Sequence, residues 1–420
     1  MQEEIIRINE KVFVHLINTN KFKSNVIAAF LLTDLNKNDV TMNALIPAVL
    51  RRGTKNLKTM KEMSIKLENM YGAVFDTSVD KIGDKQAIEV YISSINNKFA
   101  LNNEDLMSES LNFIYDVIYN PYLEKCVFSK KYVESEKKTI REIIRGRINE
   151  KGSYALNECI KEMFGDEPYG EFKYGNEKDL KAINEKQLYK QYLKILAEGE
   201  MHFYISGDIE KKKIMEFFYS KFDKRDVPVD NAVRTAKNLN LRKEEKKIVK
   251  KMKVTQGKLV LGYDVDVDIV KDFYKMTLFN TILGASANSK LFQNVREKES
   301  LAYTIRSTYL KHKGVMLISA GIELNKYEKA LELTKKQVQD MCEGNFSDED
   351  LKDAKTFLEN VYRSVEDDQT SKIELSLANF TLGVTSDIQT LIDGFNSVTR
   401  EDVIEVANKV RLTTLYYLCA

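Results

Sequence analysis

The chain has 420 residues, of which 43% are hydrophobic and 30% are charged, and it contains four Pro, 18 Gly and no Trp. This composition is typical of a soluble globular protein, and it excludes a small fold held together by disulfides or a metal, because a chain of this length buries enough apolar surface without them. Lys and Arg (65) nearly balance Asp and Glu (63), so the net charge does not favour nucleic acid or an anionic membrane as a partner.

The first third of the chain alternates between strand-like and helix-like segments. Residues 5–16 and 24–32 are rich in β-branched and aromatic side chains, which predicts strands. Residues 42–50 predict an apolar helix that is broken near Pro47, and apolar residues alternate around 88–92 as in a half-buried strand. These segments indicate an α+β fold.

Helical periodicity dominates the next part of the chain, from 104 to 147, and predicts a further helix over 154–164. A strand is expected at 201–206. Residues 224–251 are rich in Lys, contain Pro228 and show no sustained apolar period, which predicts a linker.

A similar order of elements starts again after this segment. Strands are expected at 258–267 and 315–324, and helices at 270–283, 291–298, 325–342 and 348–366. The two halves also open a late helix with related text, INEKQL at 183–188 and VTREDV at 398–403. The sequence therefore predicts two homologous α/β-sandwich halves, each with an antiparallel-rich sheet covered by helices: residues 1–223 and 252–420, joined by the linker 224–251.

The cysteines and the amino terminus indicate the compartment. Cys126, Cys159, Cys342 and Cys419 lie far apart and show no CxxC spacing, which fits a reducing environment. The first residues are acidic, and the longest early apolar stretch, 26–32, is too short to cross a bilayer. We expect a cytoplasmic protein that does not interact with membranes.

Metal-ligand spacing is absent from the histidines. His15, His202 and His312 include no pair at i,i+4 spacing, so each is predicted to be structural. Asp264, Asp266 and Asp268 are expected on one strand face, where solvation is a more common role than binding a hard cation. The chain has no phosphate-binding loop and no GxSxG elbow, so no cofactor and no self-contained active site is predicted.

The most informative segment is LFQNVREKESLAY, residues 291–303. By its pattern alone it is an amphipathic helix that runs into a strand, with Leu291, Val295 and Leu301 in the core and Arg296 as a surface charge. That interpretation needs no function.

The same segment closely resembles the signature in the second half of the insulinase/pitrilysin-like metallopeptidases, the family that includes the mitochondrial processing peptidase. In that family the Arg and Tyr of the signature reach the active site and hold the substrate backbone, which implies these roles for Arg296 and Tyr303. Similar text at 168–175 and 205–208 extends the resemblance over most of the chain.

The chain departs from this family at the zinc site. Active members carry HxxEH on a helix of the first half, where two His bind zinc and the Glu activates water. Aligning residues 52–54 with similar family text places Ala44, Pro47 and Ala48 at those positions. Glu142 falls near the family's third ligand, but one carboxylate cannot build the site, and a surface salt bridge is expected for it.

The resemblance implies a catalytically silent subunit without a cofactor. It would pair with a zinc-bearing paralogue as a heterodimer and help to bind peptide substrate through Arg296 and Tyr303. The alternative is a peptide-binding or scaffold protein that has no peptidase partner. A third hypothesis, an enzyme with an unrecognised site, has no nucleophile, base and orienting group to support it.

Overall fold

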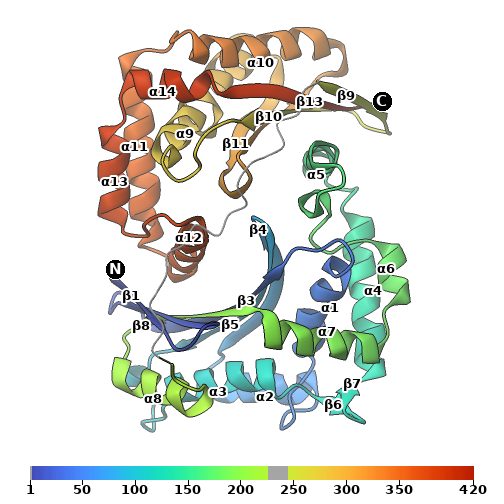
Figure 1. Cartoon of the computed structure of the whole chain (residues 1–420), viewed down its shortest axis with the longest axis vertical. Helices are drawn as coiled ribbons and strands as arrows, with labels where there is room; N and C mark the ends of the chain where they lie inside the picture. The colour runs from blue at the N-terminus through green and yellow to red at the C-terminus, as the bar shows by residue number, and fades with distance from the viewer. Residues whose placement is uncertain (1, 226–244) are drawn as a thin grey trace. The chain divides into compact units, whose positions relative to one another are not determined.

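The computed structural model describes residues 2–225 and 245–420, which form two compact units (Figure 1). Most of the linker expected at 224–251 lies outside the described residues, and its last part forms the strand β9 (Lys246–Lys251). The described part of unit 1 consists of residues 2–145, 171–225 and 368–378, and that of unit 2 of residues 146–170, 245–367 and 379–420. The units therefore differ from the two continuous segments expected, because each half of the chain supplies a short segment to the other unit.

Unit 1 contains a six-stranded sheet in the order β1-β2-β8-β3-β5-β4. Its strands are β1 (Gln2–Arg7), β2 (Val12–Asn18), β8 (Glu200–Gly207), β3 (Ser24–Asp34), β5 (Lys85–Ile95) and β4 (Val74–Ile82). Neighbouring strands are antiparallel except β2 and β8, which run parallel. A short hairpin, β6 (Leu123–Glu124) and β7 (Val127–Phe128), lies outside this sheet.

Helices cover both faces of this sheet. One face carries the larger apolar core together with the helices of the first half. These are α1 (Val40–Leu50), α2 (Met60–Asn69), α3 (Leu106–Tyr119), α4 (Lys130–Gly146), α6 (Glu177–Ala182), α7 (Glu185–Glu198) and α8 (Lys211–Lys221). The opposite face is covered by α12 (Gln369–Leu382), whose Ile373 and Leu377 pack with Phe30 and Tyr204.

Unit 2 repeats this topology in a five-stranded sheet, β11-β12-β10-β13-β9. Its other strands are β10 (Gly257–Val265), β11 (Ala302–Leu310), β12 (Val315–Ile322) and β13 (Val410–Cys419). In chain order, β9 to β13 occupy the places that β2, β3, β4, β5 and β8 take in unit 1. The single parallel pair, β9 with β13, also corresponds to the pair β2 with β8. The predicted α+β class and the two homologous sandwich halves are confirmed.

The second half supplies five helices to unit 2, and the first half supplies one. The five are α9 (Phe273–Asn280), α10 (Tyr327–Cys342), α11 (Asp348–Val365), α13 (Ile388–Ser397) and α14 (Arg400–Ala407). The sixth, α5 (Lys151–Phe164), packs its buried Met163 and Phe164 with Val260 and Leu317 of the sheet. In Figure 1 the green α5 lies beside the yellow and red strands, and the orange α12 lies by the blue ones. The two halves of the chain thus exchange a helix.

Local chemistry explains where several helices begin. Capping boxes start α2, α7, α11 and α14: the N-cap side chain accepts from the backbone N–H three positions later, and the side chain of that later residue accepts from the N-cap backbone N–H. The expected break near Pro47 is wrong: α1 continues to Leu50. Proline removes one backbone donor within the helix. The surrounding core nevertheless holds the helix, since Leu45, Ile46, Val49 and Leu50 are all buried.

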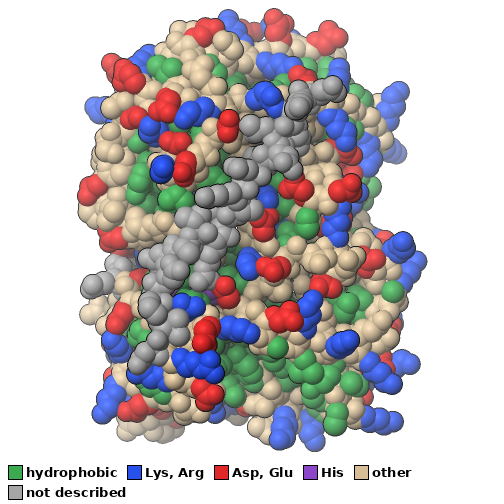
Figure 2. Space-filling model, in the orientation of Figure 1, with side chains coloured by type: hydrophobic (Ala, Val, Ile, Leu, Met, Phe, Trp, Pro, Cys, Tyr) green, Lys and Arg blue, Asp and Glu red, His purple; other side chains and the backbone are tan. Residues whose placement is uncertain are grey.

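The surface carries charges of both signs. Figure 2 shows Lys and Arg side chains interspersed with Asp and Glu over the visible face. This mixture agrees with the near balance of 65 basic and 63 acidic residues in the sequence.

Candidate functional site

Arg296 lies on a π-helical turn, Phe292–Lys298, just before β11. Such turns are rare in proteins, and those that occur often lie at functional sites. Leu291 and Val295 on this segment are fully buried, as the amphipathic pattern predicted. The Arg296 guanidinium lies 4.4 Å from the centre of the Phe292 ring, and its Nε is 3.5 Å from Glu297 Oε1. With 41% of its side chain exposed, Arg296 keeps donors available to a ligand.

Tyr303 lies at an irregularity in the edge strand β11. The pairing of β11 with β12 shifts by one residue between Ala302 and Thr304, which leaves Tyr303 as the extra residue of a bulge. Bulges redirect a side chain and are common beside active sites. Tyr303 is 53% exposed, and its hydroxyl donates a long hydrogen bond of 3.4 Å to Glu323 Oε1.

The structure brings Arg296 and Tyr303 to one cavity of about 390 Å³ in unit 2, with Glu323 and Lys326 also in its wall. Lys326 Nζ lies 2.9 Å from Glu323 Oε1, and this contact holds the pKa of the Glu323 carboxyl below its usual range. A guanidinium and a phenol both donate hydrogen bonds to carbonyl oxygens. The cavity therefore presents two side-chain donors suited to a carbonyl oxygen.

The residues at the zinc-motif positions lie on α1 in unit 1. Ala44 and Pro47 are buried, Ala48 is partly buried, and none offers a metal ligand. The Thr77 hydroxyl on β4 donates to the carbonyl oxygen of Pro47 at 3.0 Å. Glu142 is exposed on α4, and its side chain forms no hydrogen bond or ion pair with a described residue, so the expected salt bridge is not found. No group of three His, Cys, Asp or Glu that could hold a metal occurs among the described residues.

Hydrogen bonds between buried side-chain amides join α1 to β5 and α7. Asn43 Nδ2 donates to Gln86 Oε1 at 3.0 Å, and Gln191 Nε2 donates to Asn43 Oδ1 at 2.8 Å. Gln86 in turn donates to the carbonyl oxygen of Val40 at 3.1 Å. Sequence reasoning missed this network, because its three amides come from segments far apart in the chain.

Two of the histidines form a buried polar chain in unit 1. His15 Nε2 lies 3.1 Å from His202 Nδ1, and His15 Nδ1 lies 3.0 Å from Glu3 Oε1. The Ser376 hydroxyl of α12 donates to the same Glu3 oxygen at 2.5 Å. His312 bonds Thr381 at 3.0 Å in unit 2. Each histidine therefore has a hydrogen-bond partner within its own unit.

The buried contacts of Glu3, His15 and His202 predict that the protein loses stability at acidic pH. Burial lowers the pKa of the His15 imidazole, and the hydrogen bond that His15 donates to the Glu3 carboxylate opposes the effect only in part. Below pH ~6.5 an unfolded histidine takes up a proton that buried His15 does not. The free energy of unfolding should therefore decrease as the pH is lowered, by up to about 1.4 kcal/mol per pH unit, until the pH reaches the pKa of His15 in the folded protein. Urea unfolding at pH 7 and 5.5 measures this slope, and His15→Gln should flatten it; an unchanged slope in that variant would contradict the assignment.

The aspartates of the second half do not form the expected solvated strand face. β10 ends at Val265, so Asp266 and Asp268 lie beyond it. Asp264 is 1% exposed and accepts a hydrogen bond of 3.3 Å from the Thr413 hydroxyl. It has a structural role because the neighbouring strand supplies this donor.

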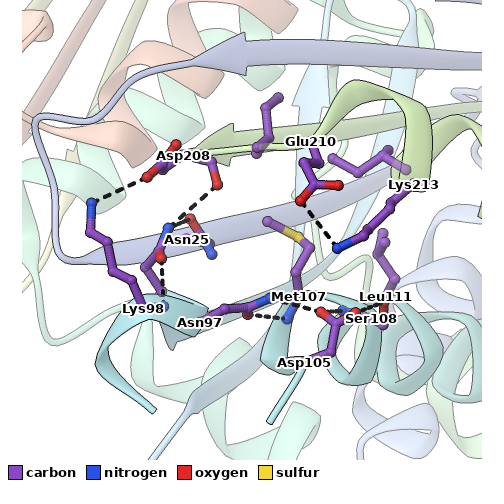
Figure 3. Close-up of a pocket in the computed structure, with 13 residues that line it drawn as sticks. Asn25, Asn97, Lys98, Asp105, Met107, Ser108, Leu111, Asp208, Glu210 and Lys213 are labelled. Carbon is purple, nitrogen blue, oxygen red and sulfur yellow. Dashed lines mark hydrogen bonds and ion pairs between the residues drawn. The ribbon is translucent and has the colours of Figure 1, made fainter. Parts of the chain in front are cut away.

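A second cavity, of about 240 Å³, lies in unit 1 between the start of α3 and the start of α8 (Figure 3). Lys98 Nζ is 3.1 Å from Asp208 Oδ2, and Lys213 Nζ is 3.1 Å from Glu210 Oε1. Asp105 accepts a hydrogen bond of 2.8 Å from Asn97 Nδ2. The two lysines at this cavity are thus each paired with a carboxylate and Asp105 is hydrogen-bonded to a neutral amide, and we assign the cavity no ligand.

Comparison with known proteins agrees with the fold and with the missing zinc motif. The family model described as "Peptidase M16 inactive domain" matches residues 182–358. The "Probable inactive metalloprotease YmfF" of Bacillus subtilis is 28% identical over 408 residues, which is 96% of this chain and 95% of that protein. The "Uncharacterized zinc protease YmxG" of the same organism is 21% identical over 73% of this chain and 74% of that protein.

A solved structure supports the same fold. The crystal structure of a conserved protein from Enterococcus faecalis V583 has a TM-score of 0.89 and 22% identity, and the match covers 100% of this chain and 98% of that one. The chain is thus similar to M16-type metallopeptidase relatives, including proteins described as a probable inactive metalloprotease and as a non-peptidase homolog. Among the described residues, no helix is both long enough and apolar enough to cross a membrane.

Proposed function

We propose that this chain is the catalytically silent partner of a zinc-bearing paralogue and that it holds peptide substrate through Arg296 and Tyr303. The observation that carries the proposal is the shared cavity of about 390 Å³, where both side chains are substantially exposed. The Arg296 donors bind peptide carbonyls, and the Tyr303 hydroxyl stabilises negative charge on a carbonyl oxygen. The zinc and the general base then come from the partner.

The relatives support the pairing. Bacillus subtilis has one relative described as an inactive metalloprotease and another described as a zinc protease. One organism thus contains both kinds of chain. A chain that keeps a peptide-holding cavity but has Ala44, Pro47 and Ala48 at the zinc positions needs such a partner to act in proteolysis.

Co-purification tests this proposal. The tagged full-length chain is expressed together with the HxxEH-bearing paralogue of the same organism, and the complex is assayed for zinc and for cleavage of an unstructured peptide. We expect a heterodimer with one zinc, bound by the paralogue, and greater cleavage than by either chain alone. If no paralogue binds but peptides do, the chain is a peptide-binding scaffold. If neither binds, the proposal is wrong.

We place this activity in the cytoplasm. Cys126, Cys159, Cys342 and Cys419 are all free thiols, and Cys126 is exposed. Exposed thiols persist in reducing compartments. Fractionation of cells that express the full-length chain tests the location, and recovery outside the cytoplasm would contradict it.

A further inference from the structure

A third cavity, of about 330 Å³, lies in unit 2 on the face of the sheet that α5 covers. Its floor consists of β10, β12 and β11, and the first turns of α5 form a wall. Consecutive residues of β11 line this cavity and the cavity of the proposed function. Tyr303 lines the cavity of the proposed function, and Thr304 lines this one.

The register of the strands determines which side chains meet on this floor. Lys258 pairs with Gly321, and Gly321 pairs with Thr304, so these three residues form one row across the sheet. In the next row on the same face, Ser319 lies between Val260 and Arg306. Residues two apart on a strand share a face, so Lys258 and Arg306 flank the same hollow.

Gly321 makes the hollow possible. A Cβ atom at this position would lie 2.9 Å from Thr304 Oγ1 and 3.1 Å from Lys258 Nζ. Glycine therefore leaves space between a cation and a hydroxyl in the middle of the sheet. The clashing atoms are ends of side chains, so an added methyl group fills the hollow without displacing the backbone.

The two cations lack the internal partners found elsewhere in the molecule. Lys258 Nζ bonds the neutral Gln256 Oε1 at 3.1 Å, and within the described residues it has no carboxylate partner. The Arg306 side chain is exposed and forms no hydrogen bond or ion pair with any described residue. In the cavity of Figure 3, by contrast, Lys98 and Lys213 are each neutralised by an adjacent carboxylate.

We propose that this cavity binds a carboxylate of the held peptide, either an acidic side chain or the free carboxyl terminus, so that a peptide with this carboxylate binds more tightly than its neutral counterpart. The Arg306 guanidinium presents paired N–H donors that match a carboxylate, and Lys258 adds a point charge on the other side of the hollow. The hydroxyls of Ser319 and Thr304 complete a polar floor. Glu150 in the wall repels any anion in the cavity, and it repels a doubly charged phosphate more strongly than a singly charged carboxylate.

This inference rests on the proposed function, and the test separates the two. Fluorescent 12-residue unstructured peptides are prepared with one internal Glu or with Gln in its place, each ending in a free carboxylate or an amide. Their affinities for the full-length chain, with its paralogue if the two co-purify, are measured by anisotropy. We expect the Glu peptide or the free-acid peptide to bind about 10-fold more tightly than its neutral counterpart. Comparison of the two pairs identifies which carboxylate is bound.

Variants test the residues. Lys258→Gln with Arg306→Gln should abolish this preference and leave the affinity for the neutral amide peptide unchanged, and Gly321→Ala should weaken it by filling the hollow. Arg363→Gln, an exposed cation on α11, is the matched control and should change nothing. Melting temperatures identify any variant that fails to fold.

The possible outcomes are distinct. Peptide binding that does not depend on a carboxylate, or a preference that survives in the double variant, overturns this inference and leaves the proposed function standing. If the wild-type protein binds none of the four peptides, the proposed function fails and the inference fails with it.

Discussion

Arg296→Ala and Tyr303→Phe should each lower peptide cleavage by the complex with the zinc-bearing paralogue about 10²-fold, the usual cost of losing one donor to a developing oxyanion. Neither change should affect the fold. Tyr303 is 53% exposed with one long hydrogen bond, and Arg296 is 41% exposed with one weak ion pair. A surface change of this kind costs at most about 0.5 kcal/mol of stability.

Three measurements on the same proteins decide this prediction: melting temperature, affinity for the paralogue and the rate of peptide cleavage. Arg363→Ala on α11 and Tyr219→Phe on α8 are matched controls, since both residues are exposed and neither lines the cavity. Full cleavage activity in both site variants would refute the role of these residues. Loss of folding or pairing together with activity would make that role structural.

The sequence predicted the elements of the fold better than it predicted their packing. Periodicity located α5 and strands such as β3, β8, β10 and β12, because apolar spacing reports which side chains are buried, but it missed β4 and placed β9 in the linker. It does not report what they are buried against. The helix at 154–164 was therefore expected to pack in the first half. In the structure its Met163 side chain lies against Gly262 of β10 and occupies the space that a Cβ atom there would need. That partner is about 100 residues away in the chain.

The candidate site also has features that the sequence predicted and features that it did not. Arg296 and Tyr303 were found because they belong to one continuous motif of 13 residues. The bulge that redirects Tyr303 depends on the register with β12, which no local pattern determines. Lys258 and Arg306 escaped notice because they belong to strands that are not adjacent in the sheet, and only Gly321 between them creates the hollow. Pro47 misled the prediction because burial outweighed its effect on the helix.

The exchanged helices predict that neither half of the chain folds alone. Residues 1–225 and 245–420, expressed separately, should aggregate, whereas co-expression should give a soluble 1:1 complex. The first fragment contains α5 but not the sheet that buries Met163 and Phe164. Burial of these two side chains is worth about 3–6 kcal/mol, a large share of the roughly 5–15 kcal/mol that stabilises a typical protein. The second fragment loses α5 and exposes the apolar face formed by Val260, Leu317 and Tyr416.

Gel filtration and circular dichroism of the separate and co-expressed fragments test this prediction. A matched rescue fusion joins residues 146–170, which contain α5, to the start of fragment 245–420 through a flexible linker. This fusion should be soluble without the other fragment, because it restores the second layer of unit 2. The same segment carrying Met163→Asp and Phe164→Asp should not rescue, since buried charge opposes packing. Two separately folded, monomeric fragments that do not associate would show that the exchanged helix contributes little to either unit.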